Sequence, residues 1–127
     1  MKQTPIVSNQ EFQPCQIVCL EYEHTRLYAE VIQVVTSRQM CWARPLMLAV
    51  CASDRDAIAP PELATLYDLR QDSDLLWPIS LFRPAVDTEV IPLLVQLDTP
   101  ETQTNQIAHQ QLKSFIQQVW QANRQEF

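Results

Sequence analysis

The amino-acid sequence predicts a mostly β, α+β domain: a small curled antiparallel sheet or partly open barrel with an amphipathic helix at its C-terminus. Short runs rich in Val, Ile, Leu and Tyr follow one another from residue 15 on, and nine prolines but no glycine punctuate the chain. Apolar residues recur at three- and four-residue spacing near the C-terminus, which is the spacing of one helix face. A flatter α+β sandwich of about four or five strands is the alternative.

The length suits one domain with a core that needs neither metal nor disulfides. Residues 1–14 are expected to form a polar lead-in, and residues 15–127 the domain itself. Within the domain, residues 15–97 are the expected β-rich part and residues 98–127 the helical part.

The first three strands are expected at 15–23, 26–35 and 39–51. Short polar segments, Glu23-His24-Thr25 and 36–39, separate them and predict hairpin turns. Pro45 interrupts the third run, and because proline cannot donate to a strand ladder we expect a break or bulge at Arg44-Pro45.

The next segments are interpreted as loop and short extended pieces. Residues 52–63 contain a Pro-Pro pair and predict a loop, and residues 65–69 a short strand. Because Pro78, Pro84 and Pro92 oppose a long helix, residues 67–97 are expected to be extended pieces joined by turns. Asp87 and Glu89 are interpreted as a cap or turn within this stretch.

The last segment is the clearest helix. Thr99 is a suitable N-cap, Pro100 suits the first helical position, and Glu101 stabilises the positive end of the helix dipole. A helix from Pro100 to Asn123 follows, with an apolar stripe that we expect to face the core: Ala108, Leu112, Phe115, Ile116, Val119 and Ala122.

The absence of glycine excludes several classes of enzyme in their standard form. Phosphate-binding loops, dinucleotide fingerprints and the serine elbow of hydrolases all require glycine at fixed positions. Turns must instead place other residues at positive φ, for which Asn, Asp and His are the usual choices. We found no catalytic motif and expect no cofactor and no enzymatic activity.

Charge and hydropathy limit the partners. The formal net charge of −6 repels a phosphate backbone, and the seven arginines are scattered singly, so nucleic acid is not an expected partner. The N-terminus lacks the apolar stretch of a signal peptide, and no run approaches the roughly 18 apolar residues of a membrane span. We therefore expect a cytoplasmic protein.

Cysteine and histidine give little support for a metal site. Cys15, Cys19, Cys41 and Cys51 contain no Cys-x-x-Cys pair, and although four thiolates could hold zinc, their spacing matches no finger or ribbon. Free, half-buried thiols are the expected state. His24 and His109, the two histidines of the chain, lie in no motif, so surface or structural roles are expected for both.

One acidic cluster is a candidate site for a different chemistry. Asp68, Asp72 and Asp74 lie close together near Arg70 and could bind a cation or act as an acid–base pair. A solvated, turn-forming stretch explains them equally well.

Aromatic residues near Arg-Pro pairs are the candidate partner-binding residues. Tryptophan and arginine are enriched in interface cores, and a surface of this kind can dock an extended or proline-containing peptide. Burial in the core is the alternative for both tryptophans. The candidates are Trp42, Arg44, Trp77, Phe82 and Arg83.

Three segments carry a resemblance to a group of proteins. The strand 26–35 and the segments 74–78 and 81–84 look like small uncharacterised proteins of cyanobacteria, and scarce lysine and abundant glutamine agree with that source. The resemblance implies an accessory role near the photosynthetic or gene-expression apparatus, and it attaches no activity to any residue. The expected sheet itself is similar to the Src-homology or Tudor kind of barrel.

Three functions remain as hypotheses. The first is a non-enzymatic module that docks on another protein as an adaptor or assembly factor. The second is a small enzyme or cation-binding protein that uses Asp68, Asp72 and Asp74. The third is a purely structural subunit, which would present a large apolar face on the helix side.

Overall fold

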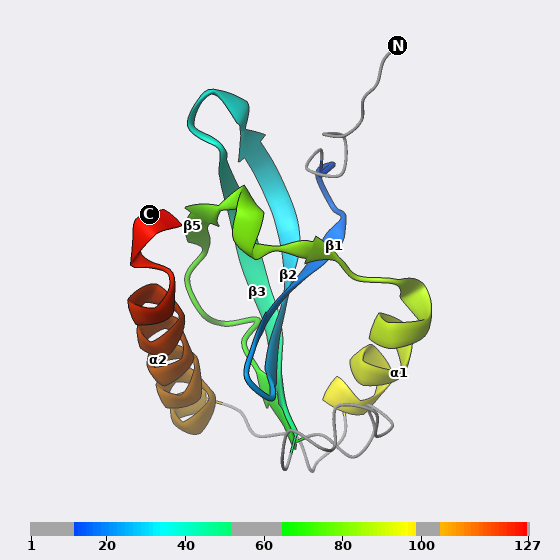
Figure 1. Cartoon of the computed structure of the whole chain (residues 1–127). Coiled ribbons are helices and arrows are strands. Elements are labelled where there is room, and N and C mark those ends of the chain that lie inside the picture. Colours follow the sequence, from blue (N-terminus) through cyan, green and yellow to red (C-terminus); the bar gives the residue numbers. More distant parts are fainter. Residues whose placement is uncertain (1–11, 52–64, 99–104, 127) are drawn as a thin grey trace.

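The computed structural model describes residues 12–51, 65–98 and 105–126 as an open antiparallel sheet with two α-helices (Figure 1). The strands lie in the order β4-β3-β2-β1-β6, and β5 pairs with β3 beside β4. In chain order the elements are β1 (Ile17–Tyr22), β2 (Thr25–Val35), η2 (Thr36–Arg38), β3 (Met40–Val50), β4 (Thr65–Asp68), β5 (Leu75–Pro78), η5 (Ile79–Leu81), β6 (Arg83–Pro84), α1 (Asp87–Leu97), α2 (Asn105–Ala122) and η6 (Arg124–Glu126). The predicted antiparallel sheet with a C-terminal helix is therefore confirmed.

The long strand β3 organises the sheet. Its first residues, Met40 to Ala43, pair with β5, and its last residues, Met47 to Val50, pair with β4. Between them Ala29 of β2 lies opposite Pro45, while the preceding Tyr28 lies opposite Met47, so Leu46 is an extra residue. The bulge expected at the proline is confirmed, and it changes the face on which the following side chains lie.

Both predicted hairpins are present, but their turns place Glu and Gln at positive φ and not the expected Asn, Asp or His. Glu23 follows β1 with φ 57°, and Gln39 precedes β3 with φ 55°. Cys15, where the chain enters the sheet, has φ 73°, and its N–H donates to the carbonyl of Val31. A left-handed conformation costs a residue with a Cβ about 1–2 kcal/mol, which glycine would avoid.

The C-terminal helix is confirmed over Asn105–Ala122, whereas the expected cap at Thr99 to Glu101 lies outside the described residues. Most of its predicted apolar stripe is buried, with Ile116 half-buried and Ala122 exposed. The fully packed members are Ala108, Leu112, Phe115 and Val119. They cover one face of the sheet.

Within residues 67–97, the expectation of extended structure was wrong over residues 87–97, because α1 forms there. Asp87 and Glu89 occupy its first turn, where the helix dipole favours anions. Pro92 lies inside the helix and removes one internal hydrogen bond, that to the carbonyl of Thr88. Both Thr88 and Pro92 are exposed, so water can reach this carbonyl, and the burial of Val90, Leu93 and Leu97 holds the helix in place.

The two helices lie on opposite faces of the sheet (Figure 1). Neighbouring residues on one strand therefore enter different cores: Leu27 packs with the residues of α2, and Tyr28 with those of α1. Phe12, within the segment expected to be a polar lead-in, is also buried in the core beneath α2. Among the described helices, none is long and apolar enough to cross a membrane.

Candidate docking surface

The end of the sheet where β5 pairs with β3 has one face that α1 does not cover. Cys41 and Ala43 of β3 are buried beneath α2. Because side chains alternate along a strand, Trp42 and Arg44 lie on the opposite face. Trp42 lies directly opposite Leu76 of β5. These two large apolar side chains are 38% and 49% exposed.

A groove of about 420 Å³ runs across this face from β2 to β5. Apolar side chains supply most of its surface, and its lining residues are Gln33, Val35, Trp42, Asp74, Leu75 and Leu76. Hydrogen-bonded strands contribute five of these residues, so the groove is built on rigid backbone.

Asp74 fixes the tryptophan at the rim of the groove. The indole Nε1–H of Trp42 donates to Oδ2 of Asp74 at 3.0 Å, and Arg44 Nε lies 3.8 Å from Oδ1 of the same carboxylate. The polar atom of the indole is therefore satisfied while its apolar ring stays accessible.

The other two aromatic candidates lie in the core. Trp77 is 7% exposed and Phe82 5% exposed, and both pack beneath α2 with Ile79. Trp77 is the neighbour of Leu76 on β5, and the alternation of side chains along a strand turns it to the covered face. Trp77 and Phe82 therefore stabilise the fold and form no part of the groove.

Arg83 belongs to an ion-pair network that joins the sheet to α1. Its guanidinium donates to both carboxylate oxygens of Glu89, at 3.1 and 2.8 Å, and to Glu21 at 3.3 Å. The hydroxyl of Tyr28 donates to Glu89 as well. Burial alone would raise the pKa of Glu89, but the hydrogen bonds from Arg83 and Tyr28 bring this pKa below its usual value.

The three clustered aspartates have separate partners. Arg70 donates to both oxygens of Asp68 and lowers the pKa of that carboxyl. Asp72 lies 2.6 Å from Nδ1 of His109, and Asp74 contacts the tryptophan as described. Within the described parts of the chain, no group of three His, Cys, Asp or Glu side chains is placed to hold a metal ion.

The four cysteines are free thiols in different environments. Cys15 is exposed and Cys51 half-buried, whereas Cys19 and Cys41 are buried. Burial raises the pKa of Cys19 to about 12 and that of Cys41 to about 11. The two buried thiols are therefore core side chains without nucleophilic character at neutral pH.

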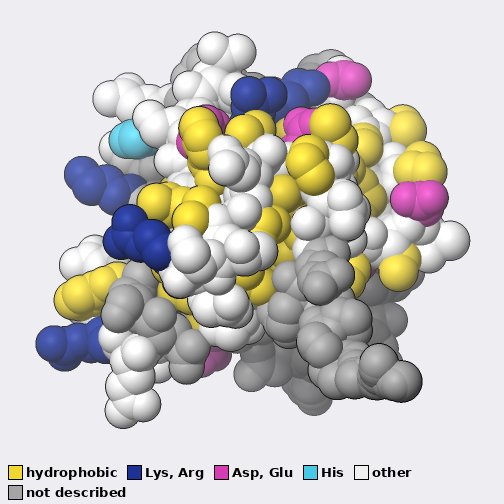
Figure 2. Space-filling model, turned by 90° about the horizontal axis from the view of Figure 1, so that it is seen from above, with side chains coloured by type: hydrophobic (Ala, Val, Ile, Leu, Met, Phe, Trp, Pro, Cys, Tyr) yellow, Lys and Arg dark blue, Asp and Glu magenta, His cyan; other side chains and the backbone are white. Residues whose placement is uncertain are grey.

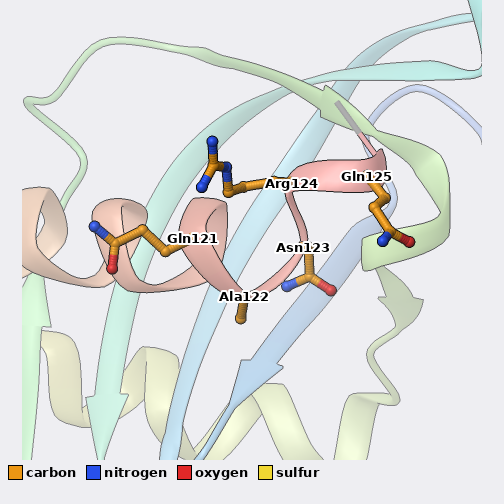
Figure 3. A pocket seen from close by; sticks show the side chains of 5 residues that line it. All are labelled: Gln121, Ala122, Asn123, Arg124 and Gln125. Carbon is orange, nitrogen blue, oxygen red and sulfur yellow. The ribbon is translucent and has the colours of Figure 1, made fainter.

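A second hollow, of about 530 Å³, lies at the end of α2 (Figure 3). Five consecutive residues, 121–125, line it, and in Figure 3 the side chains of Gln121, Asn123 and Gln125 point in different directions. Asn123 Nδ2 donates to the carbonyl of Val119 at 3.0 Å, which closes the helix end. The hollow follows from the turn of the chain after the helix, and its polar groups do not converge on one ligand.

The outer side of α1 is an apolar surface that sequence reasoning missed. Val86, Ile91 and Val95 are all exposed, and no Lys or Arg occurs in the helix. Seen from the end with the β2–β3 connection, hydrophobic side chains gather over the middle and right of the molecule, and Lys and Arg lie on its left and upper rim (Figure 2). Once α1 is recognised as a helix, the spacing of Ile91 and Val95 identifies this stripe.

Comparisons with known proteins identified no related family from which a role for the groove could be transferred. No family model, no curated protein and no solved structure matches the chain.

Proposed function

We propose that the protein is a non-enzymatic docking module, an adaptor or assembly factor, that binds another protein through the groove around Trp42. The observation that supports this function is a tryptophan held accessible in an apolar groove by a hydrogen bond to Asp74. Tryptophan and arginine side by side are the residue types that most often dominate the binding energy of interfaces.

The arrangement around Trp42 suits binding for two energetic reasons. Its indole N–H keeps its partner when the ring is covered, so burial of the ring leaves no polar group without a hydrogen bond. The groove also lies on paired strands, so a partner orders little of the protein when it binds.

We place this function in the cytoplasm of a bacterium; the four free cysteines support the reducing compartment, since such compartments keep thiols free. The clustered aspartates offer less support for the enzyme hypothesis. Asp68, Asp72 and Asp74 each have a different partner, so they do not converge on one substrate position.

The test compares Trp42→Ala with Trp120→Ala, because Trp120 on α2 is another exposed tryptophan, 45% accessible, outside the groove. Partners are captured from the native cell with the wild-type chain, and the affinity of a purified partner is then measured by calorimetry. Trp42→Ala should weaken binding by about thirtyfold, the effect of an interface residue worth about 2 kcal/mol, while Trp120→Ala retains affinity.

Both variants must first give the wild-type circular dichroism spectrum and a similar midpoint of urea unfolding. If a partner binds both variants as tightly as the wild-type chain, or if the purified protein binds none and turns over a small molecule, the docking function is wrong.

A further inference from the structure

The charge at the groove indicates what chemistry its occupant carries. Both oxygens of Asp74 already have partners, Trp42 Nε1 on one side and Arg44 Nε on the other. Arg44, by contrast, has a side chain that is 52% exposed, and its ion pair with Asp74 is long at 3.8 Å. A guanidinium carries five N–H donors, and within the described ranges Arg44 makes no hydrogen bond with them.

A second carboxylate, that of Glu30, lies near Arg44. Glu30 of β2 lies opposite Arg44 in the strand register, yet no ion pair joins the two in the described part of the chain. Beside the groove, β3 therefore presents a guanidinium that can donate two hydrogen bonds to a carboxylate in a bidentate arrangement.

The spacing between Trp42 in the groove and Arg44 beside it sets the geometry of a ligand. Trp42 and Arg44 are two residues apart on one face of β3, which separates them by about 6.6–6.8 Å along the strand. Side chains two residues apart in an extended peptide have the same separation. When one side chain of the peptide packs over the apolar floor of the groove, the side chain two residues further along lies near Arg44.

We infer that the occupant of the groove is an extended segment of a partner protein, with an aliphatic side chain against Trp42 and Leu76 and a carboxylate two residues away that pairs with Arg44. This inference rests on the proposed docking function and adds the chemistry of the partner to it. The carboxylate comes from an Asp or Glu side chain or from the end of the partner chain. Charge complementarity with Arg44 distinguishes this segment from a purely apolar or a basic one.

The test uses a displayed library of random peptides, selected on the immobilised wild-type protein. The selected peptides are then synthesised with the carboxylate intact or replaced by its amide, and with free or amidated C-termini. Their affinities are measured by fluorescence anisotropy. The inference expects an aliphatic residue and a carboxylate two positions apart, with about a tenfold loss on amidation of the carboxylate.

Three variants separate the contributions. Arg44→Glu should remove the preference for the carboxylate and select Lys or Arg in its place. Arg124→Glu makes the same charge change in η6, outside the groove, and should leave the preference intact. Trp42→Ala should weaken all peptides. The amidated C-termini show whether a side chain or a chain end supplies the carboxylate.

The inference is overturned if amide and carboxylate peptides bind equally or if Arg44→Glu keeps the wild-type preference. It is also overturned if no peptide binds the wild-type protein more tightly than it binds the Trp42→Ala variant. When a protein partner depends on Trp42 but is indifferent to Arg44→Glu, the docking function stands and the carboxylate inference fails. When the partner is indifferent to Trp42→Ala as well, the docking function fails with it.

Discussion

The network around Glu89 predicts a measurable loss of stability when its charge is removed without a change of shape. Glu89 in the first turn of α1 accepts two hydrogen bonds from Arg83 and one from Tyr28. Glu89→Gln keeps the size of the side chain, but the amide turns an N–H₂ group toward one of these donors. At least one hydrogen bond is lost, and the contact between α1 and the sheet weakens.

The magnitude follows from the burial of each group. A hydrogen bond to a charged group contributes about 1.5–3 kcal/mol to stability. The side chain of Arg83 is 41% exposed, so water replaces part of its loss, whereas Tyr28 is fully buried and its hydroxyl cannot be rehydrated without opening the core. We expect Glu89→Gln to lower the free energy of unfolding by about 2 kcal/mol, and Tyr28→Phe, which leaves the Arg83 pair intact, by about 1.5 kcal/mol.

Urea unfolding followed by circular dichroism at pH 7 measures both variants. Glu23→Gln is the matched control, because it makes the same chemical change at an exposed position in the β1–β2 turn and should stay within about 0.5 kcal/mol of the wild type. A loss of less than about 0.5 kcal/mol for Glu89→Gln would refute the proposed role of this network.

The acid dependence gives a second test of the same reasoning. The pKa of Glu89 is lower in the folded protein than in the unfolded chain, so its charge stabilises the fold fully above the unfolded pKa of about 4.3. This contribution is lost as the pH falls through the lower, folded pKa. The stability difference between the wild type and Glu89→Gln should therefore be largest at neutral pH and shrink in acid, and parallel curves would contradict the assignment.

Three further predictions concern turns, core and thiols. Glu23→Gly should raise the free energy of unfolding by roughly 0.5–1 kcal/mol in urea, because glycine relieves the positive φ at this turn. Trp77→Ala should lower it by about 3–5 kcal/mol in the same assay, as expected for a large aromatic side chain removed from a core. In a thiol titration of the native protein at pH 8, Cys15 should react rapidly, whereas Cys19 and Cys41 should react only on unfolding, since burial raises both pKa values.

The sheet could be predicted because its local signals agree with its final environment. The polar segments that contain Glu23 and Gln39 separate apolar runs. Because the chain has no glycine, these two residues adopt the positive φ that the turns require. Pro45 likewise marks the bulge correctly, because a missing N–H is a property of the residue itself.

The helix α1 was missed because the prolines received too much weight and the apolar pattern too little. Pro92 lies on the exposed side of the helix and removes one hydrogen bond, whereas Val90, Leu93 and Leu97 each bury a side chain. Their three- and four-residue spacing was present in the sequence. The burial of these three apolar side chains outweighs the hydrogen bond lost at Pro92, although a proline is usually interpreted as the end of a helix.

Trp42 and Trp77 show that the alternation of residues along the sequence does not by itself predict which side chains are exposed. Met40, Trp42, Arg44, Leu46 and Leu48 share one parity in the sequence, which predicts a single face. The extra residue Leu46 reverses the parity, so Leu48 packs beneath α2 while Trp42 faces away from it. Which tryptophan is exposed therefore depends on a bulge and on the helix that covers each face, and neither is a local property of the sequence around it.

The absence of glycine affects how the groove can bind a partner. In the described residues, the connection between β2 and β3 turns at Gln39 with a positive φ, and its side-chain amide donates to the carbonyl of Thr36 at 2.9 Å. A residue with a Cβ has fewer backbone conformations available than glycine, so a turn of this kind has little freedom to change, although its left-handed φ costs about 1–2 kcal/mol. The groove lies on the strands that this turn connects, together with β5. Binding should therefore leave the backbone of the groove nearly unchanged, and specificity should depend on the shape of the apolar floor and the charge of Arg44 more than on adaptation to each partner.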